Sequence, residues 1–180
     1  MKTGIRKVLD NLPRLQAGVD RLSTLEVLAG VPRDKTQRNE EPMITNAAIA
    51  FIQDQGSPAQ NIPARPFMRP GISNAKEAIA TSFKRAAKRA VDGQTNASVE
   101  EDLHRAGLKA QNSIRAAINE GIPPPLSIAT LKARARRGRK GAKKALEAIN
   151  AGGPANIADA KPLVDSGQLR NSITYVVRKK

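Results

Sequence analysis

Apolar residues recur at helical spacing through most of the chain, so the sequence predicts a mainly helical protein. The first such stretch covers residues 3–22, and Pro13 within it predicts a kink or a restart of the helix. Four further helices are expected over residues 44–56, 74–91, 98–120 and 126–153.

Residues typical of helix ends flank several of these stretches. Thr45 or Asn46, Ser73, and the pair Ser98 and Glu101 suit N-terminal caps. Glycines suit C-terminal ends or breaks, and they are Gly56, Gly121, Gly138 and Gly141. On the second helix, the inward face is expected to include Ala48, Phe51 and Ile52.

Two stretches alternate apolar and polar residues and predict strands, at residues 24–31 and 171–178. The predicted fold is therefore α+β: several helices packed on a small antiparallel sheet, with an alanine-rich, basic helical extension. Two strands alone are marginal. Either a third strand lies within residues 33–44, of which residues 33–42 are otherwise expected to be a charged loop, or neighbouring subunits complete the sheet.

We expect one domain over residues 1–180. Its α+β core is predicted to comprise residues 24–91 and 154–180, and residues 98–153 a helical, basic insertion. Aromatic residues make up only 2% of the chain and much of the apolar content is alanine, which buries little area per residue. We therefore expect a thin core and a contribution of partner subunits to stability.

The composition also excludes several kinds of site and segment. The chain has no cysteine, which excludes disulfides and thiolate-based zinc sites, and we predict no cofactor and no metal. No apolar run approaches the roughly 20 residues that span a bilayer, and the N-terminus lacks the apolar core of a signal peptide. A protein assembled in the cytoplasm, with no membrane partner, is the expectation.

The formal net charge is +15, and one basic segment concentrates it. This segment, residues 132–144, contains no acidic residue. A contact with DNA phosphates, a contact with an acidic protein and a solvated face all fit such a run, and we favour the first two. The predicted contact residues are Lys132, Arg134, Arg136, Arg137, Arg139, Lys140, Lys143 and Lys144.

Residues 61–71, NIPARPFMRPG, form a second unusual segment, which we call the strap. Three prolines predict extended backbone rather than helix and leave little entropy to lose on docking. Phe67 and Met68 could occupy a pocket while Arg65 and Arg69 pair with acidic groups. Equally, Phe67 could plug the core of its own chain. The predicted partner-contact residues are Arg65, Pro66, Phe67, Met68, Arg69 and Pro70.

No catalytic constellation emerges from the sequence. Asp165, Ser166 and Gly167 resemble a nucleophile triplet, but a nucleophilic serine needs a nearby base. The single histidine, His104, lies beside the apolar face of a predicted helix and is expected to be a solvated or packing residue. The GRKGAKK stretch lacks the spacing of a phosphate-binding loop. We therefore predict a protein that is not an enzyme.

Two motifs in this order resemble those of the tail-completion and neck proteins of tailed bacteriophages, including the virion-morphogenesis and minor-tail-protein family. The first lies within residues 55–72, and the second within residues 126–177. The matching positions are Gly56, Pro63, Arg65, Pro66, Phe67, Arg69, Pro70, Leu126, Thr130, Lys161, Pro162, Leu163, Asp165, Gly167, Leu169, Ser172 and Ile173.

The resemblance implies a structural virion protein, assembled in the host cytoplasm, that completes the head-proximal end of a tail and helps join tail to head. It implies a homo-oligomeric ring, expected to be a hexamer, contacting tail-tube, terminator or head-connector proteins and, in the channel, DNA. Within the second motif, Asp165 and Leu169 are further expected contact residues.

A free, non-sequence-specific nucleic-acid-binding protein is the alternative from another class. It would explain the charge but leave the two motifs without a role. The scarcity of aromatic residues also removes the platforms on which bases stack.

Overall fold

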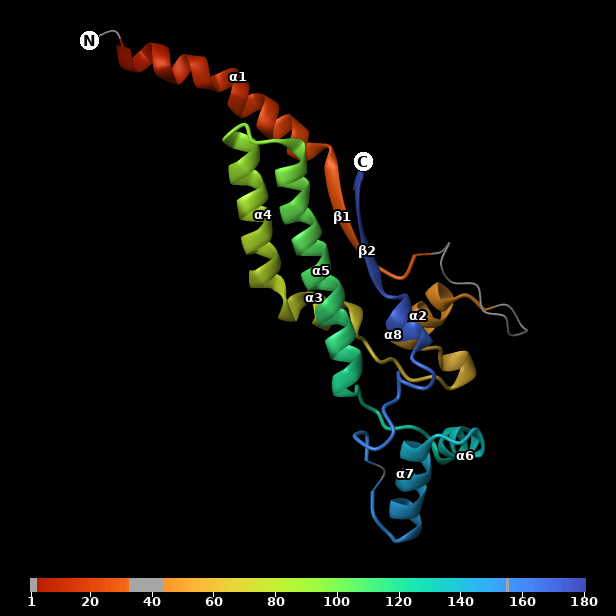
Figure 1. Cartoon of the computed structure of the whole chain (residues 1–180). Helices are drawn as coiled ribbons and strands as arrows, with labels where there is room; N and C mark the ends of the chain where they lie inside the picture. Colours follow the sequence, from red (N-terminus) through yellow and green to blue (C-terminus); the bar gives the residue numbers. More distant parts are fainter. Residues whose placement is uncertain (1–2, 33–43, 155) are drawn as a thin grey trace. The chain divides into compact units, whose positions relative to one another are not determined.

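A computed structural model describes residues 3–32, 44–154 and 156–180, with residues 3–11 described as backbone only (Figure 1). The charged loop predicted at residues 33–42 lies outside these ranges. The same holds, apart from Ile44, for the third strand sought within residues 33–44. Both expectations stay predictions.

Helices dominate the described chain and accompany a single pair of hydrogen-bonded antiparallel strands, which confirms the α+β class. The elements are α1 (Thr3–Ser23), β1 (Leu25–Gly30), α2 (Asn46–Gln55), the 3-10 turn η1 (Pro58–Gln60), α3 (Met68–Asn74), α4 (Lys76–Val91), α5 (Asn96–Glu120), α6 (Ile128–Arg136), α7 (Lys140–Asn150), α8 (Gln168–Ser172) and β2 (Thr174–Lys179). Strands β1 and β2 lie almost 150 residues apart in the sequence and side by side in the sheet (Figure 1).

The described chain falls into two compact units. Unit 1 comprises residues 1–29, 74–111 and 175–180, and unit 2 comprises residues 30–73 and 112–174. Each unit collects segments that are distant in sequence. The expectation that residues 1–180 form one domain stays a prediction.

Unit 1 is built around α4 and α5, whose small residues bring the elements close together. Its core consists of Ala86, Ala90, Val99 and Leu103, and Leu22, Leu25, Val27 and Val177 pack against it. A Cβ atom at Gly18 of α1 would lie 2.6 Å from the Ala90 carbonyl oxygen. Because glycine and alanine have small side chains, the backbones of these helices approach one another closely, as the alanine-rich composition leads one to expect.

The fully buried side chains of unit 2 are larger than those of unit 1. Phe67, Ile114, Ile118 and Ile173 are inaccessible to solvent. Helices α6 and α7 pack on each other through a smaller cluster, whose buried members are Leu131, Ala142, Ala145 and Ala160.

Several predicted helix ends are confirmed. Thr45 caps α2 by accepting a hydrogen bond from the Ala48 N–H at 3.2 Å, and Gly56 ends that helix with a positive φ of 80°. Gly121 follows the last residue of α5 with φ 86°. The expected break in the basic helical stretch is confirmed at Gly138, between α6 and α7, but not at Gly141, which lies inside α7.

Other local predictions are wrong. Ser73 lies inside α3 rather than capping α4. Helix α1 continues through Pro13, so the helix does not restart there, and the alternative of a kink stays a prediction. Helix α5 begins earlier than expected, because Thr95 Oγ1 accepts from the Ser98 N–H at 3.3 Å and so takes the capping role given to Ser98. On α2 the predicted inward residue Phe51 is 69% exposed, while Asn46 and Ala50 are buried.

The strap is only partly extended. Its last residues open α3, which begins at Met68, so the expectation of a wholly non-helical strap is wrong. Pro70 is the third residue of α3, where its missing N–H removes no intrahelical hydrogen bond. Strand β2 likewise begins at Thr174, after the short helix α8, instead of at residue 171.

Candidate partner and DNA interface

The strap is fixed to unit 2 by its buried half. Phe67 is completely buried, which is the arrangement of the intramolecular alternative. Pro66, Arg69 and Pro70 are exposed, and Met68 is half-buried. The strap therefore presents an exposed edge beside buried residues, and a partner contact through that edge stays a prediction.

Asp54 in the last turn of α2 anchors the turn from strap to α3. Its Oδ1 accepts the backbone N–H groups of Phe67 at 2.8 Å and Met68 at 3.1 Å. Sequence reasoning missed this residue. A usable signal existed, since a carboxylate in the last turn of a helix faces an unfavourable dipole and so indicates a compensating partner.

Arg65 is 5% exposed and makes no ion pair with any of the residues that the structure describes. Its Nε and Nη2 donate to the Pro124 carbonyl oxygen at 3.1 and 3.0 Å, and Nη2 also reaches that of Pro125 at 3.4 Å. Burial lowers the pKa of its guanidinium from the ordinary value. The contact joins the strap to residues 124–125, directly before the second motif.

Arg134 has a similar environment within the second motif. It is 8% exposed, and its Nη1 donates to the carbonyl oxygens of Lys161 and Val164, both at 2.9 Å. Its Nη2 donates to that of Pro162 at 2.6 Å. Arg134 is therefore a structural link from α6 to residues 161–164, although it was predicted as a contact to DNA or an acidic partner.

The basic segment meets acidic residues of its own chain. Arg137 Nη1 and Arg139 Nε each lie 2.9 Å from a carboxylate oxygen of Asp165. Lys144 Nζ lies 2.7 Å from Asp159 Oδ1, and this hydrogen bond and the charge of Asp159 raise the pKa of Lys144. Asp165, predicted as a partner contact, is thus engaged with the basic segment, and Leu169 is buried.

Four cations of the segment make no ion pair with any residue of the described ranges: Lys132, Arg136, Lys140 and Lys143. All four are exposed. Lys132 and Arg136 are four residues apart on α6, and Lys140 and Lys143 three apart on α7, so each pair shares a helix face. We call these residues the free cations.

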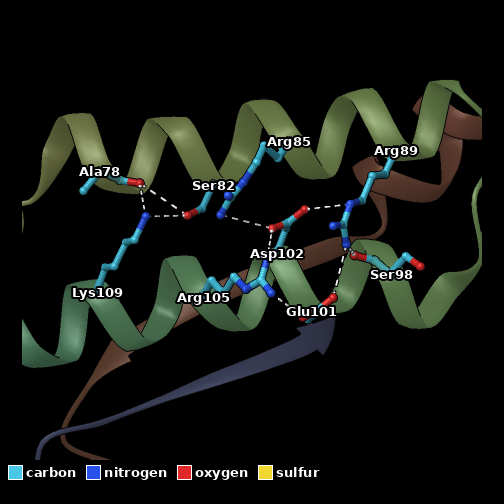
Figure 2. A network of polar contacts seen from close by, with 9 residues as sticks. All are labelled: Ala78, Ser82, Arg85, Arg89, Ser98, Glu101, Asp102, Arg105 and Lys109. Atoms are coloured by element: carbon cyan, nitrogen blue, oxygen red, sulfur yellow. Dashed lines mark hydrogen bonds and ion pairs between the residues drawn. The ribbon is translucent and has the colours of Figure 1, made fainter.

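Unit 1 contains a second charged network, on the facing surfaces of α4 and α5 (Figure 2). Asp102 is 0% exposed, and its Oδ1 lies 3.3 Å from Arg85 Nη2 and 3.1 Å from Arg105 Nη1. Arg89 Nε lies 3.2 Å from Oδ2, without the alignment of a hydrogen bond. Sequence reasoning did not identify Asp102, because acidic residues in the first turns of a helix have an ordinary electrostatic explanation.

Further polar contacts extend this network along both helices. Arg89 Nη1 donates to the Ser98 carbonyl oxygen at 2.8 Å and lies 3.2 Å from Glu101. Glu101 also pairs with Arg105. Lys109 Nζ donates to the Ala78 carbonyl oxygen and to Ser82 Oγ, both at 3.0 Å (Figure 2).

His104 is exposed, and its ring packs edge-on against Tyr175 with the centroids 5.8 Å apart. Within the described ranges, no group of three or more His, Cys, Asp or Glu residues could hold a metal ion. No helix in those same ranges is long and apolar enough to cross a membrane.

Comparison with known proteins found no matching family model, no matching curated protein and no matching solved structure.

Proposed function

We propose that this chain is a structural virion protein of a tailed bacteriophage, without catalytic activity. It completes the head-proximal end of the tail and helps join tail to head as a homo-oligomeric ring, expected to be a hexamer, next to tail-tube, terminator or head-connector proteins.

The observation that carries the proposal is that a buried arginine anchors each of the two motif segments within unit 2. Buried Arg65 joins the strap to residues 124–125, and buried Arg134 joins α6 to residues 161–164. The exposed Pro66, Arg69 and Pro70 lie next to anchored residues, since Arg65 is hydrogen-bonded and Phe67 is buried. An exposed edge next to such anchors has less entropy to lose on docking than a free segment, which suits a permanent subunit contact.

The free cations favour a second candidate, a non-sequence-specific nucleic-acid-binding protein. Four unpaired, exposed charges on two neighbouring helices suit phosphate contacts. Within a ring they would also serve the first candidate, by touching DNA in the channel or an acidic neighbour. Both candidates can bind DNA, so a measurement of ring assembly distinguishes them better than a measurement of DNA binding does.

Native mass spectrometry and negative-stain microscopy of the full chain test the proposal. We expect closed rings, and we expect the protein in purified phage particles at a few copies each. A chain that stays monomeric, binds DNA with a steep salt dependence and is missing from particles would instead support the second candidate.

A variant of the exposed strap edge tests whether this surface forms the contact between subunits. Arg69→Glu reverses an exposed charge that has no described partner, so we expect rings to be lost while the monomer keeps its melting temperature. Lys76→Glu, an equal charge change at the exposed start of α4, is the matched control and should leave rings intact. Equal effects of both variants would contradict a role of the strap edge.

A further inference from the structure

Unit 2 contains a cavity of about 840 Å³ between the strap, the segment before α6 and the start of α6. Its polar walls carry Arg65, Arg134, Gln53, Ser127 and Thr130, and its apolar walls are mainly prolines. No carboxylate occurs among its described lining residues. The size and the mixed walls are those of a site for a small ligand or for a few side chains.

The two arginines give this cavity an uncompensated positive charge. Both donate only to backbone carbonyl oxygens, which accept hydrogen bonds but carry no charge. The remaining donors, Arg65 Nη1 and Arg134 Nε, have no acceptor among the described residues and are not fully enclosed. Such donors remain available to a ligand.

The electrostatics of Arg134 agree with this geometry. Burial is the main cause that lowers its pKa, and repulsion from Arg137, Arg139 and Arg65 adds to it. Asp165 opposes these effects, but its carboxylate already pairs with Arg137 and Arg139. An additional anion in the cavity would relieve the repulsion between Arg65 and Arg134.

The position of the arginines decides which anion fits. Both side chains are more than nine-tenths buried, so the phosphates of a stiff DNA duplex cannot approach them closely. A flexible carboxylate side chain can enter, and the neighbouring Pro63, Pro125 and Leu126 offer apolar contact to the rest of a peptide. Planar guanidinium groups also match the geometry of a carboxylate.

We propose that this cavity binds an acidic side chain presented by an extended segment of a protein partner. The site is separate from the exposed strap edge and from the free cations. The proposal does not depend on the chain being a tail protein, so it can fail or hold independently of that function.

Thermal unfolding of the full chain with small probes tests the site directly. N-acetylglutamate α-amide, which has one side-chain carboxylate, should raise the melting temperature in a saturable way. N-acetylglutamine α-amide, its uncharged counterpart, should not do so at matched ionic strength. Equal shifts with both probes, or no shift with either, would overturn the proposal. A saturable shift with inorganic phosphate but not with the carboxylate would also overturn it, since the site would then take phosphate.

The variant Gln53→Glu places a carboxylate in the cavity wall without removing any described side-chain hydrogen bond. Gln60→Glu, an equal charge change on an exposed residue outside the wall, is the control. Gln53 lies in the last turn of α2, where the helix dipole disfavours a carboxylate, but we expect the attraction of Arg65 and Arg134 to outweigh this cost. Gln53→Glu should therefore melt about 2–4 °C above Gln60→Glu, the shift typical of a modest gain in a protein of this size. It should also abolish the response to the carboxylate probe. A lower melting temperature for Gln53→Glu, or an unchanged response to the probe, would contradict a positively charged cavity.

Discussion

The buried charged side chains of the described residues have two kinds of partner. Asp102 is surrounded by guanidinium groups, so its charge is neutralised as well as hydrogen-bonded. Arg65 and Arg134 contact carbonyl oxygens instead, and burial lowers the pKa of each guanidinium. Guanidinium groups stay protonated even so. Arg65 and Arg134 therefore each place a positive charge inside unit 2 that no negative charge within the described ranges neutralises directly.

These partners could not be predicted from the sequence. Arg65 and the carbonyl group of Pro124 are 59 residues apart, and Arg134 is 27–30 residues from the carbonyl groups it contacts. Any residue offers a carbonyl oxygen, so no side-chain pattern marks the acceptor. The strong local patterns, in contrast, predicted the basic segment and the strap but not which of their residues are buried.

Asp102→Asn tests the charged network of unit 1. The substitution keeps the size of the side chain but removes the charge shared by Arg85, Arg89 and Arg105. Because these arginines are partly exposed and can turn to water, we expect a loss of about 2–3 kcal/mol in the free energy of unfolding, at the lower end for a broken buried pair.

Urea denaturation measures that loss, and Glu101→Gln is its control. Glu101 is about half exposed, so removing its charge should cost less than about 1 kcal/mol. Similar losses for the two variants would show that the burial of Asp102 adds nothing.

At the scale of elements, composition and periodicity predicted most helices and both strands, while several ends were misplaced. Helix α3 was missed because a strap rich in proline discourages a helix, yet its first turn needs no N–H from Pro70. The exposed Phe51 shows a different limit, since a short helix such as α2 offers two plausible faces and tertiary packing selects one.

Close helix contacts at glycine were also invisible in the sequence. A Cβ atom at Gly71 of α3 would lie 2.6 Å from the Cα atom of Ile114 on α5. Both residues are buried in unit 2. Since the nearest atom belongs to backbone, the two helices would have to separate to make room.

Gly71→Ala should therefore destabilise the protein, although alanine favours helices more than glycine does. We expect a net cost of about 1–3 kcal/mol, as for other overpacked sites, measured as the change in the midpoint of urea unfolding. Ser73→Ala, at an exposed position of the same helix, should change stability by less than about 0.5 kcal/mol. A neutral or stabilising Gly71→Ala would mean that α3 and α5 tolerate separation.

For the whole molecule, the question is whether the net charge of +15 acts as a diffuse field or through one surface. Asp159 and Asp165 already engage three cations of the basic segment, and Arg134 is buried. What remains for a DNA contact are the free cations of α6 and α7. A count of charges in the sequence could not have made this distinction, because it assigns the same weight to all eight.

A quadruple variant that changes Lys132, Arg136, Lys140 and Lys143 to glutamine tests this distinction against a control of equal charge. The control changes Lys76, Lys84, Lys88 and Lys179, which are also exposed, so both variants lower the net charge from +15 to +11. If the free cations contact DNA, the first variant should bind a 20-base-pair duplex more weakly than the control.

The salt dependence of the same binding measurement identifies the cause. Affinity falls as salt rises, and each lost phosphate contact makes the negative slope of log affinity against log salt shallower by about 0.9. We therefore expect the magnitude of that slope to decrease by about 3–4 for the free-cation variant and to change little for the control. Equal losses in both would mean that attraction to DNA belongs to the net charge of the molecule, and the free cations would then have no special part in it. An unchanged slope in both variants would leave an acidic protein surface as the partner that the free cations fit.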